Sequence, residues 1–140
     1  TDDQAVNRAV SAAAEEAGLW ANVTDQPQLC SFTLPALFRR GELLVTVSTG
    51  GASPLVAARL KEELAAQFGQ AWKPYLNLLK ALRAAVLAQD RPPEENRALF
   101  EAAVEADLLS PLGQGDWTEV GRRLKEACGL DLKDLEGPFE

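Results

Sequence analysis

The hydrophobic pattern changes at Ser53–Pro54, and this change constrains the fold more than any other feature of the chain. Before it, a helix-like stretch is followed by short runs of alternating residues, which is typical of α/β structure. After it, apolar residues recur at intervals of three and four, which is typical of helices alone. The sequence therefore predicts an α/β segment, the end of a Rossmann-like domain, followed by an all-α segment.

The first segment predicts a helix that Asp2 or Asp3 caps and that Gly18 ends. One face of this helix is apolar and consists of Val6, Val10, Ala13, Ala14 and Ala17. The mostly apolar run 19–23 predicts a buried strand, and residues 24–27 a polar turn. Helix, strand and polar turn in this order are typical of an α/β sheet.

Two further runs, 32–38 and 43–48, alternate as β-strands do, and we expect a hairpin turn at 39–42. Pro35 cannot donate a ladder hydrogen bond, so its strand should lie at an edge or carry a bulge. Ser53 is a favoured N-cap and Pro54 a favoured first residue for the next helix.

From Pro54 onward we expect three or four helices, separated near residues 90–93 and 113–115. Asp116–Glu119 resembles a capping box, and Gly129 should end the helix that follows. The three tryptophans, Trp20, Trp72 and Trp117, are expected in the core. The acidic tail from Asp131 is expected to be loose.

Histidine is absent from all 140 residues, and this absence excludes much chemistry. Ser-His-Asp triads, Cys-His pairs and His-ligated zinc all require an imidazole, and we expect no resident metal. The net charge is −7, opposite in sign to that of most nucleic-acid-binding proteins, so we expect no nucleic-acid partner.

The sequence has no apolar run long enough for a membrane span and no leader, so we expect no membrane partner and a cytoplasmic protein. Two cysteines, Cys30 and Cys128, do not make a disulfide framework, although one disulfide stays open. The chain contains no methionine, even at position 1, so we expect it to be part of a longer polypeptide.

The glycine-rich loop 48–54 lies between a predicted strand and a helix start. Amides exposed by Gly50 and Gly51, together with the helix dipole, predict an anion site. The alternative is a tight, well-capped turn without a ligand. The loop is neither a Walker loop nor a dinucleotide fingerprint.

Asp25 follows the carboxyl end of a predicted strand, which is where open α/β sheets bind ligands. The alternative is an ordinary turn aspartate before Pro27. Cys30 has no histidine partner and is expected to be a small buried apolar residue. Arg39–Arg40 is expected in a solvated turn, with an acidic ligand as the alternative.

Three runs carry a resemblance to a known family. Residues 1–7 resemble the end of an "AATDDxxVN" motif, residues 22–32 resemble "NVVDxPxLCxF", and residues 44–54 resemble "LxVAVSTGGxSP". In this order and spacing, the chain resembles the bifunctional precorrin-2 dehydrogenase/sirohydrochlorin ferrochelatase family, the dehydrogenase part of siroheme synthase. The resemblance is dense as far as Arg59 and is only a helical pattern beyond it.

The resemblance implies an enzyme that oxidises precorrin-2 to sirohydrochlorin with NAD, and in many members inserts ferrous iron as a further substrate. It implies a homodimer that binds a tetrapyrrole. Asp25 matches the catalytic aspartate, and Thr1 and Asn22 match cofactor-side positions. The substrate-binding loop matches Ser48, Thr49, Gly50, Gly51 and Ser53. Whether chelation occurs, and whether a methyltransferase follows, is left open.

The resemblance also implies three regions: residues 1–27 as the end of the NAD domain, 28–69 for dimerisation and the substrate loop, and 70–140 as a helical domain. The family's N-terminal "GGGxVAxRK" loop is absent, so we expect this chain alone to bind NAD weakly or not at all. A non-enzymatic dimerisation or tetrapyrrole-binding module is the alternative, and a helical interaction domain with an α/β leader is a third.

Overall fold

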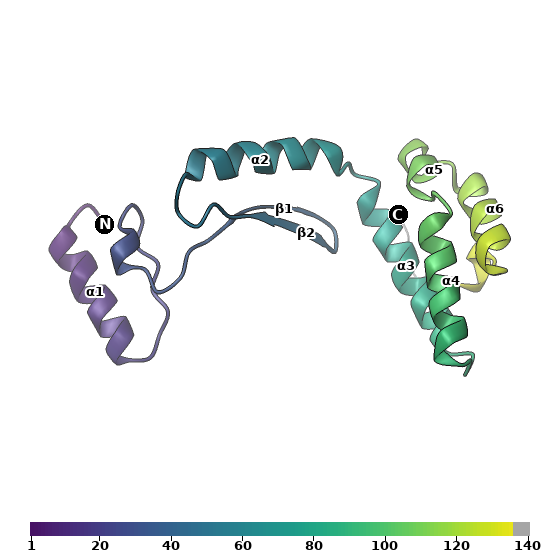
Figure 1. Cartoon of the computed structure of the whole chain (residues 1–140), viewed down its shortest axis with the longest axis horizontal. Helices are drawn as coiled ribbons and strands as arrows, with labels where there is room; N and C mark the ends of the chain where they lie inside the picture. Colours follow the sequence, from purple (N-terminus) through teal and green to yellow (C-terminus); the bar gives the residue numbers. More distant parts are fainter. Residues whose placement is uncertain (136–140) are drawn as a thin grey trace. The chain divides into compact units, whose positions relative to one another are not determined.

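A computed structural model describes residues 1–135 (Figure 1). Within that range, the chain forms α-helices, short 3-10 turns and one two-stranded sheet. In chain order these are α1 Gln4–Glu16, η1 Pro27–Leu29, β1 Ala36–Arg40, β2 Leu43–Val47, α2 Pro54–Gln67, α3 Trp72–Leu87, α4 Pro93–Glu105, α5 Leu109–Gln114, α6 Trp117–Cys128 and η2 Leu132–Asp134. A short sheet followed by helices confirms the predicted fold class.

The chain divides into two compact units. The N-terminal unit comprises residues 1–37 and 46–62, and the helical unit comprises residues 38–45 and those from 63 onward. We describe each unit by itself. Within residues 1–135, no helix is both long enough and apolar enough to cross a lipid bilayer.

Helix α1 begins as predicted, because the Asp3 carboxylate accepts hydrogen bonds from the amides of Ala5 and Val6. Gly18 follows the helix with a φ of +66°, a left-handed conformation that favours glycine. On its apolar face, Val6 and Val10 are 44% and 58% exposed, whereas Ala14 is half-buried.

The strand predicted over residues 19–23 does not form. Trp20 is 83% exposed, so its expected place in the core is also wrong. A strand needs a neighbour for its backbone ladder, and here the only partner among residues 1–37 and 46–62 is the segment 30–32, which bonds mainly through side chains. An apolar run alone therefore gives an extended but unpaired segment.

The hairpin forms, but with different limits from those predicted. Strand β1 begins only at Ala36, after Pro35, which cannot donate to a ladder. The turn is Gly41–Glu42 alone, with Gly41 at φ +60°. Arg40 lies within β1, with its guanidinium over the Phe38 ring and donating to the Ala65 carbonyl, so it is not part of a solvated turn.

Helix α2 begins at Pro54, as the serine–proline pair predicts. The Ser53 hydroxyl accepts from the Val56 amide at 3.3 Å, which is the expected N-cap contact. This start fixes the end of the glycine-rich loop that precedes it.

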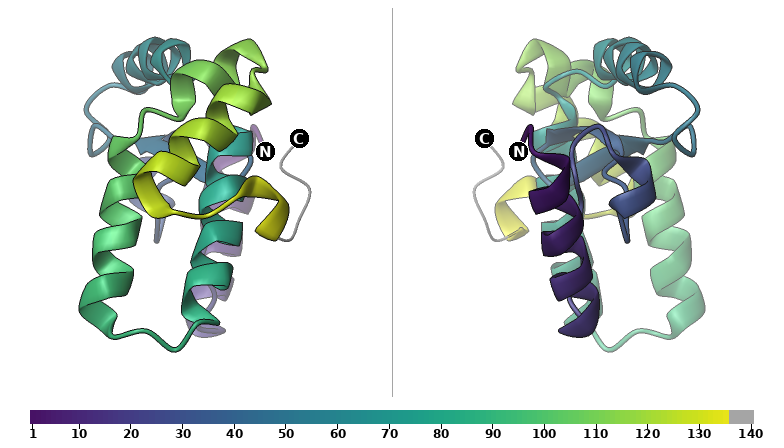
Figure 2. Two further views of the ribbon diagram at one scale, coloured as in Figure 1. Left: turned by 90° about the vertical axis from the view of Figure 1, so that its right-hand side faces the viewer. Right: turned by 90° about the vertical axis from the view of Figure 1, so that its left-hand side faces the viewer.

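The core of the helical unit lies between α3, α4, α5 and α6 (Figure 2). Its centre consists of fully buried side chains from α3, α4 and α6, namely Leu78, Leu82, Val86, Ala103, Val120 and Leu124. Trp72 and Trp117 pack against this core, as expected. The 3-4 spacing of the α3 stripe is therefore a packing pattern.

Helix α6 begins and ends as predicted. Asp116 Oδ1 accepts from the Glu119 amide at 3.0 Å, and Gly129 adopts φ +70°. The break expected at 113–115 is only partly right, because Gly113 lies inside α5 and Gly115 ends it.

The first residues of the tail are not loose as expected, since η2 forms and Leu135 is buried. The remainder of the predicted loose tail, 136–140, lies outside the described residues.

Candidate substrate cavity

A cavity of about 480 Å³ lies within the N-terminal unit. Two segments that are far apart in sequence line it: the loop 22–27 and the loop 47–51, with residues 33–36 and the start of α2 between them. Both loops were singled out from the sequence. The structure therefore brings Asp25 to the same cavity as Ser48, Thr49 and Gly51.

Asp25 lies at the tip of its loop with φ +59°. Few residues other than glycine adopt this left-handed conformation, although Asp and Asn do so more readily than most. The turn closes through a hydrogen bond from the Gln26 amide to the Val23 carbonyl at 3.2 Å. Asp25 is solvent-exposed and lines the cavity.

Three amides of the glycine-rich loop are hydrogen-bonded within the loop itself. The Gly50 amide donates to Ser48 Oγ at 3.2 Å, and the Ala52 amide to the Thr49 carbonyl at 3.0 Å. The Ser53 amide donates to Thr49 Oγ1 at 3.1 Å. Gly50 and Ser53 therefore shape the loop and do not line the cavity.

The Gly51 amide takes no part in these hydrogen bonds within the loop, and Gly51, at φ +85°, lines the cavity. The Ser48 hydroxyl accepts from Gly50 and keeps its own proton available to donate. An anion bound at this loop would therefore meet the Gly51 amide and the Ser48 hydroxyl as donors.

The described lining of the cavity contains no lysine or arginine. Its polar groups come from Asn22, Thr24, Asp25, Gln26, Cys30, Thr33, Ser48 and Thr49. A ligand with several carboxylates would therefore meet hydrogen-bond donors and not full positive charges from these residues. Among residues 1–135, no group of three or more Cys, Asp or Glu side chains lies close enough to hold a metal ion.

The two residues expected on the cofactor side lie in different places. Asn22 lines the cavity, and its Nδ2 donates to the Phe32 carbonyl at 2.9 Å. Thr1 does not line it; its hydroxyl donates to Asn7 Oδ1 at 3.0 Å. Asn7 itself is only 6% exposed, and sequence reasoning missed it because a polar residue on a helix gives no signal of burial.

Cys30 was expected to be a buried apolar residue, and this expectation is wrong. It is partly buried, lines the cavity and contacts polar backbone atoms of the Asp25 loop through its sulfur. Both Cys30 and Cys128 are free thiols. Cys128 is buried in the helical core, where burial raises the pKa of its thiol.

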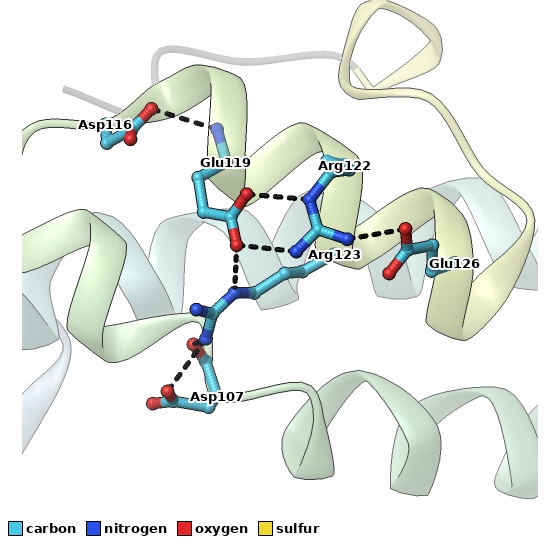
Figure 3. A network of polar contacts seen from close by, with 6 residues as sticks. All are labelled: Asp107, Asp116, Glu119, Arg122, Arg123 and Glu126. Atoms are coloured by element: carbon cyan, nitrogen blue, oxygen red, sulfur yellow. Dashed lines mark hydrogen bonds and ion pairs between the residues drawn. The ribbon is translucent and has the colours of Figure 1, made fainter.

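The densest charged network lies in the helical unit, away from this cavity's lining (Figure 3). Hydrogen bonds from Arg122 and Arg123 lower the pKa of the Glu119 carboxyl to about 2. Arg123 also donates to the Asp107 carboxylate at 2.8 Å, which ties α6 to the residue that follows the end of α4. All of these donors and acceptors are paired, so the network is structural.

Comparisons with known proteins match two stretches of the chain, and each stretch contains one of the two cavity loops. Residues 1–36 match the family described as "Putative NAD(P)-binding", and residues 40–67 match "Sirohaem biosynthesis protein central". The chain is similar to part of the dehydrogenase region of siroheme synthases.

Siroheme synthase of Methylococcus capsulatus is 37% identical over 128 residues, covering 91% of this chain and 27% of that protein. Siroheme synthase of Thioalkalivibrio sulfidiphilus is 32% identical over 139 residues, covering 98% of this chain and 28% of that protein. The chain thus spans about a quarter of the length of these siroheme synthases.

Among solved structures, SirC, a precorrin-2 dehydrogenase, matches with a TM-score of 0.72 and 25% identity. The match covers 93% of this chain and 61% of SirC. The fold of this chain is therefore similar to that of part of SirC.

Proposed function

We propose that the full-length protein oxidises precorrin-2 to sirohydrochlorin in siroheme biosynthesis, with NAD accepting the hydride. The observation that carries this proposal is the meeting of the Asp25 loop and the Ser48–Gly51 loop at one cavity. The similarity to siroheme synthases and to SirC supports it. The tetrapyrrole is the substrate that this cavity would take.

The described residues do not supply a cradle for a dinucleotide. The sequence has no dinucleotide fingerprint, and the amides of Gly50, Ala52 and Ser53 are used within their own loop. Cofactor binding would therefore need residues in addition to the described ones. Thr1 and Asn22 remain proposed contributors to that side of the site.

Asp25 is proposed as the group that accepts the proton released in the oxidation. A two-electron oxidation of this type transfers a hydride and leaves a proton, and with no histidine in the chain a carboxylate is the available base. Asp25 is the only carboxylate among the described residues that line the cavity. The same carboxylate would accept pyrrole protons if the protein also inserts ferrous iron.

The decisive variant is Asp25→Asn in the full-length protein. Asparagine tolerates the left-handed φ of +59° that this position requires, whereas alanine would add strain, so the change removes basicity with little effect on the backbone. We expect kcat for sirohydrochlorin formation to fall at least about a hundredfold, the low end of the usual contribution of a general base. Spectrophotometric assay of sirohydrochlorin gives kcat, and thermal melting checks folding.

The matched control is Asp90→Asn. Asp90 is also an exposed aspartate with positive φ, at +47°, but it lies in the turn between α3 and α4. This variant should retain full activity. Near-normal turnover of a folded Asp25→Asn protein would remove Asp25 from the mechanism.

A second candidate function is tetrapyrrole binding without catalysis, since the chain contains the cavity but no dinucleotide fingerprint. Calorimetric titration separates the two contributions. We expect this chain alone to bind sirohydrochlorin measurably and NAD weakly or not at all. A full-length protein that binds sirohydrochlorin yet forms none from precorrin-2 and NAD would favour the binding module.

A further inference from the structure

The segment Cys30–Phe32 lies alongside Ala21–Val23 and closes the loop that carries Asp25. The Ser31 amide donates to the Ala21 carbonyl at 2.9 Å, and Ser31 Oγ accepts from the Ala21 amide at 2.7 Å. Asn22 Nδ2 donates to the Phe32 carbonyl at 2.9 Å. These bonds fix the base of the loop, several residues away from its tip.

Nearer the tip of the loop, the Cys30 thiol contacts the loop backbone. Its Sγ accepts from the Val23 amide at 3.2 Å, and lies 3.3 Å from the Val23 carbonyl and 3.4 Å from the Gln26 carbonyl. The single thiol proton donates to one of these carbonyls at a time. Val23 and Gln26 flank Asp25, so the sulfur is held to the backbone on both sides of it.

Asp25 needs such support because its φ of +59° is sparsely populated for a residue with a side chain. The loop has no strand ladder to hold it, since residues 19–23 form no strand. A backbone conformation of this kind persists where surrounding contacts determine it. The contacts nearest to Asp25 are the Val23–Gln26 turn bond and those of Cys30.

We propose that Cys30 is a positioning residue: its thiol holds the 23–26 turn so that the Asp25 carboxylate faces the cavity. This inference rests on the proposed function, in which Asp25 accepts the proton. Cys30 takes no part in the chemistry and needs no histidine partner. Serine would keep a donor and an acceptor on a shorter bond, and alanine would remove both.

The experiment measures kcat and the KM for NAD of Cys30→Ala and Cys30→Ser in the full-length protein. A small misplacement of a catalytic group can cost about a hundredfold in rate, so we expect kcat of Cys30→Ala to fall about ten- to a hundredfold. The KM for NAD should stay within about twofold, because the change leaves cofactor contacts alone. Cys30→Ser should recover part of the loss, and it serves as the test variant if Cys30→Ala does not fold.

A double-mutant cycle separates positioning from general destabilisation. If Cys30 acts through Asp25, Cys30→Ala should cause no further loss of kcat in the Asp25→Asn background. Multiplicative losses in the double variant would overturn the inference. So would a Cys30→Ala protein with kcat within about twofold of the parent.

The matched control is Cys128→Ala, which removes the other thiol. Cys128 is buried in the helical unit, with its Sγ 3.4 Å from the Leu99 carbonyl, so its loss should lower the melting temperature but not kcat. The two proposals fail differently. A full-length protein that does not oxidise precorrin-2 contradicts the proposed function, whereas loss of activity in Asp25→Asn with full activity in Cys30→Ala contradicts only this inference.

Discussion

The Asn7 side chain is hydrogen-bonded to Thr1 at the start of α1. Asn7 Nδ2 donates to the Thr1 carbonyl at 2.8 Å, and the Thr1 hydroxyl donates to Asn7 Oδ1 at 3.0 Å. Asn7 is almost fully buried, so these bonds are shielded from water. They fix the backbone of a residue that is proposed to lie on the cofactor side of the site.

We therefore expect Asn7→Ala in the full-length protein to raise the KM for NAD more than it lowers kcat. The variant should also be less stable by about 0.5–1.5 kcal/mol for each hydrogen bond lost, the usual net contribution of such a bond. Steady-state kinetics and urea unfolding measure the two effects. Asn96→Ala is the control, because Asn96 is a buried asparagine of α4 and should affect stability alone. An equal change in KM in both variants would contradict the assignment.

The α6 network predicts a pH-dependent contribution to stability. The pKa of Glu119 is lowered from 4.5 to about 2, chiefly by hydrogen bonds from Arg122 and then Arg123. A lowered pKa in the folded state means that ionised Glu119 stabilises the fold above about pH 4.5, and that this contribution is lost as the pH falls through about 2. Glu119→Gln should therefore lower the melting temperature by a few degrees at pH 7 and by progressively less below pH 4.5.

Thermal melts of both proteins between neutral and acid pH test this. Glu101→Gln is the comparison, since Glu101 pairs with Arg97 alone on an exposed face of α4. It should shift the melting temperature less than Glu119→Gln does. A pH-independent difference between the parent and Glu119→Gln would show that ionisation of Glu119 is not the cause.

The core of the helical unit predicts a large cost for truncation at Leu124. This side chain is completely buried between α6 and its neighbours. Leu124→Ala should lower the free energy of unfolding by about 2–5 kcal/mol. Leu87→Ala, at a position that is 53% exposed, should change it by no more than about 0.5 kcal/mol. Chemical denaturation of the two variants provides the comparison, and similar losses in both would contradict the described core.

The hairpin predicts self-association. Leu37 of β1 and Leu44 of β2 are 51% and 45% exposed, and a sheet of two strands leaves free edges. We expect a homodimer by light scattering, and we expect Leu44→Lys to shift it toward monomer. Val104→Lys, at an exposed position of α4, should remain dimeric. A monomeric parent at high concentration would contradict this prediction.

Local signals predicted the helix boundaries well. Asp3, Ser53 and Asp116 each accept a hydrogen bond from the first turn of a helix, because capping depends only on residues within three or four positions. Features that depend on contacts between distant residues were harder to predict. Residues 19–23 have the composition of a strand, but a strand forms only beside another, and no pattern within the run specifies that neighbour.

The candidate site could be predicted only in part. Asp25, Ser48 and Thr49 were identified by position and by resemblance, and the structure brings them to one cavity. The use of the loop amides within the loop depends on side-chain rotamers that sequence does not specify. The contacts of Cys30 depend on how residues 30–32 return past residues 21–23, which is again a tertiary relationship.

The exposure of Trp20 gives the N-terminal unit its own optical signal. Its indole is 83% exposed, whereas Trp72 and Trp117 pack against the core of the helical unit. In a variant carrying Trp72→Phe and Trp117→Phe, fluorescence would report on Trp20 alone. We expect this emission to be red-shifted and quenched by acrylamide. It should shift to the blue when another surface covers residues 19–23. Assembly around this segment could then be followed in real time.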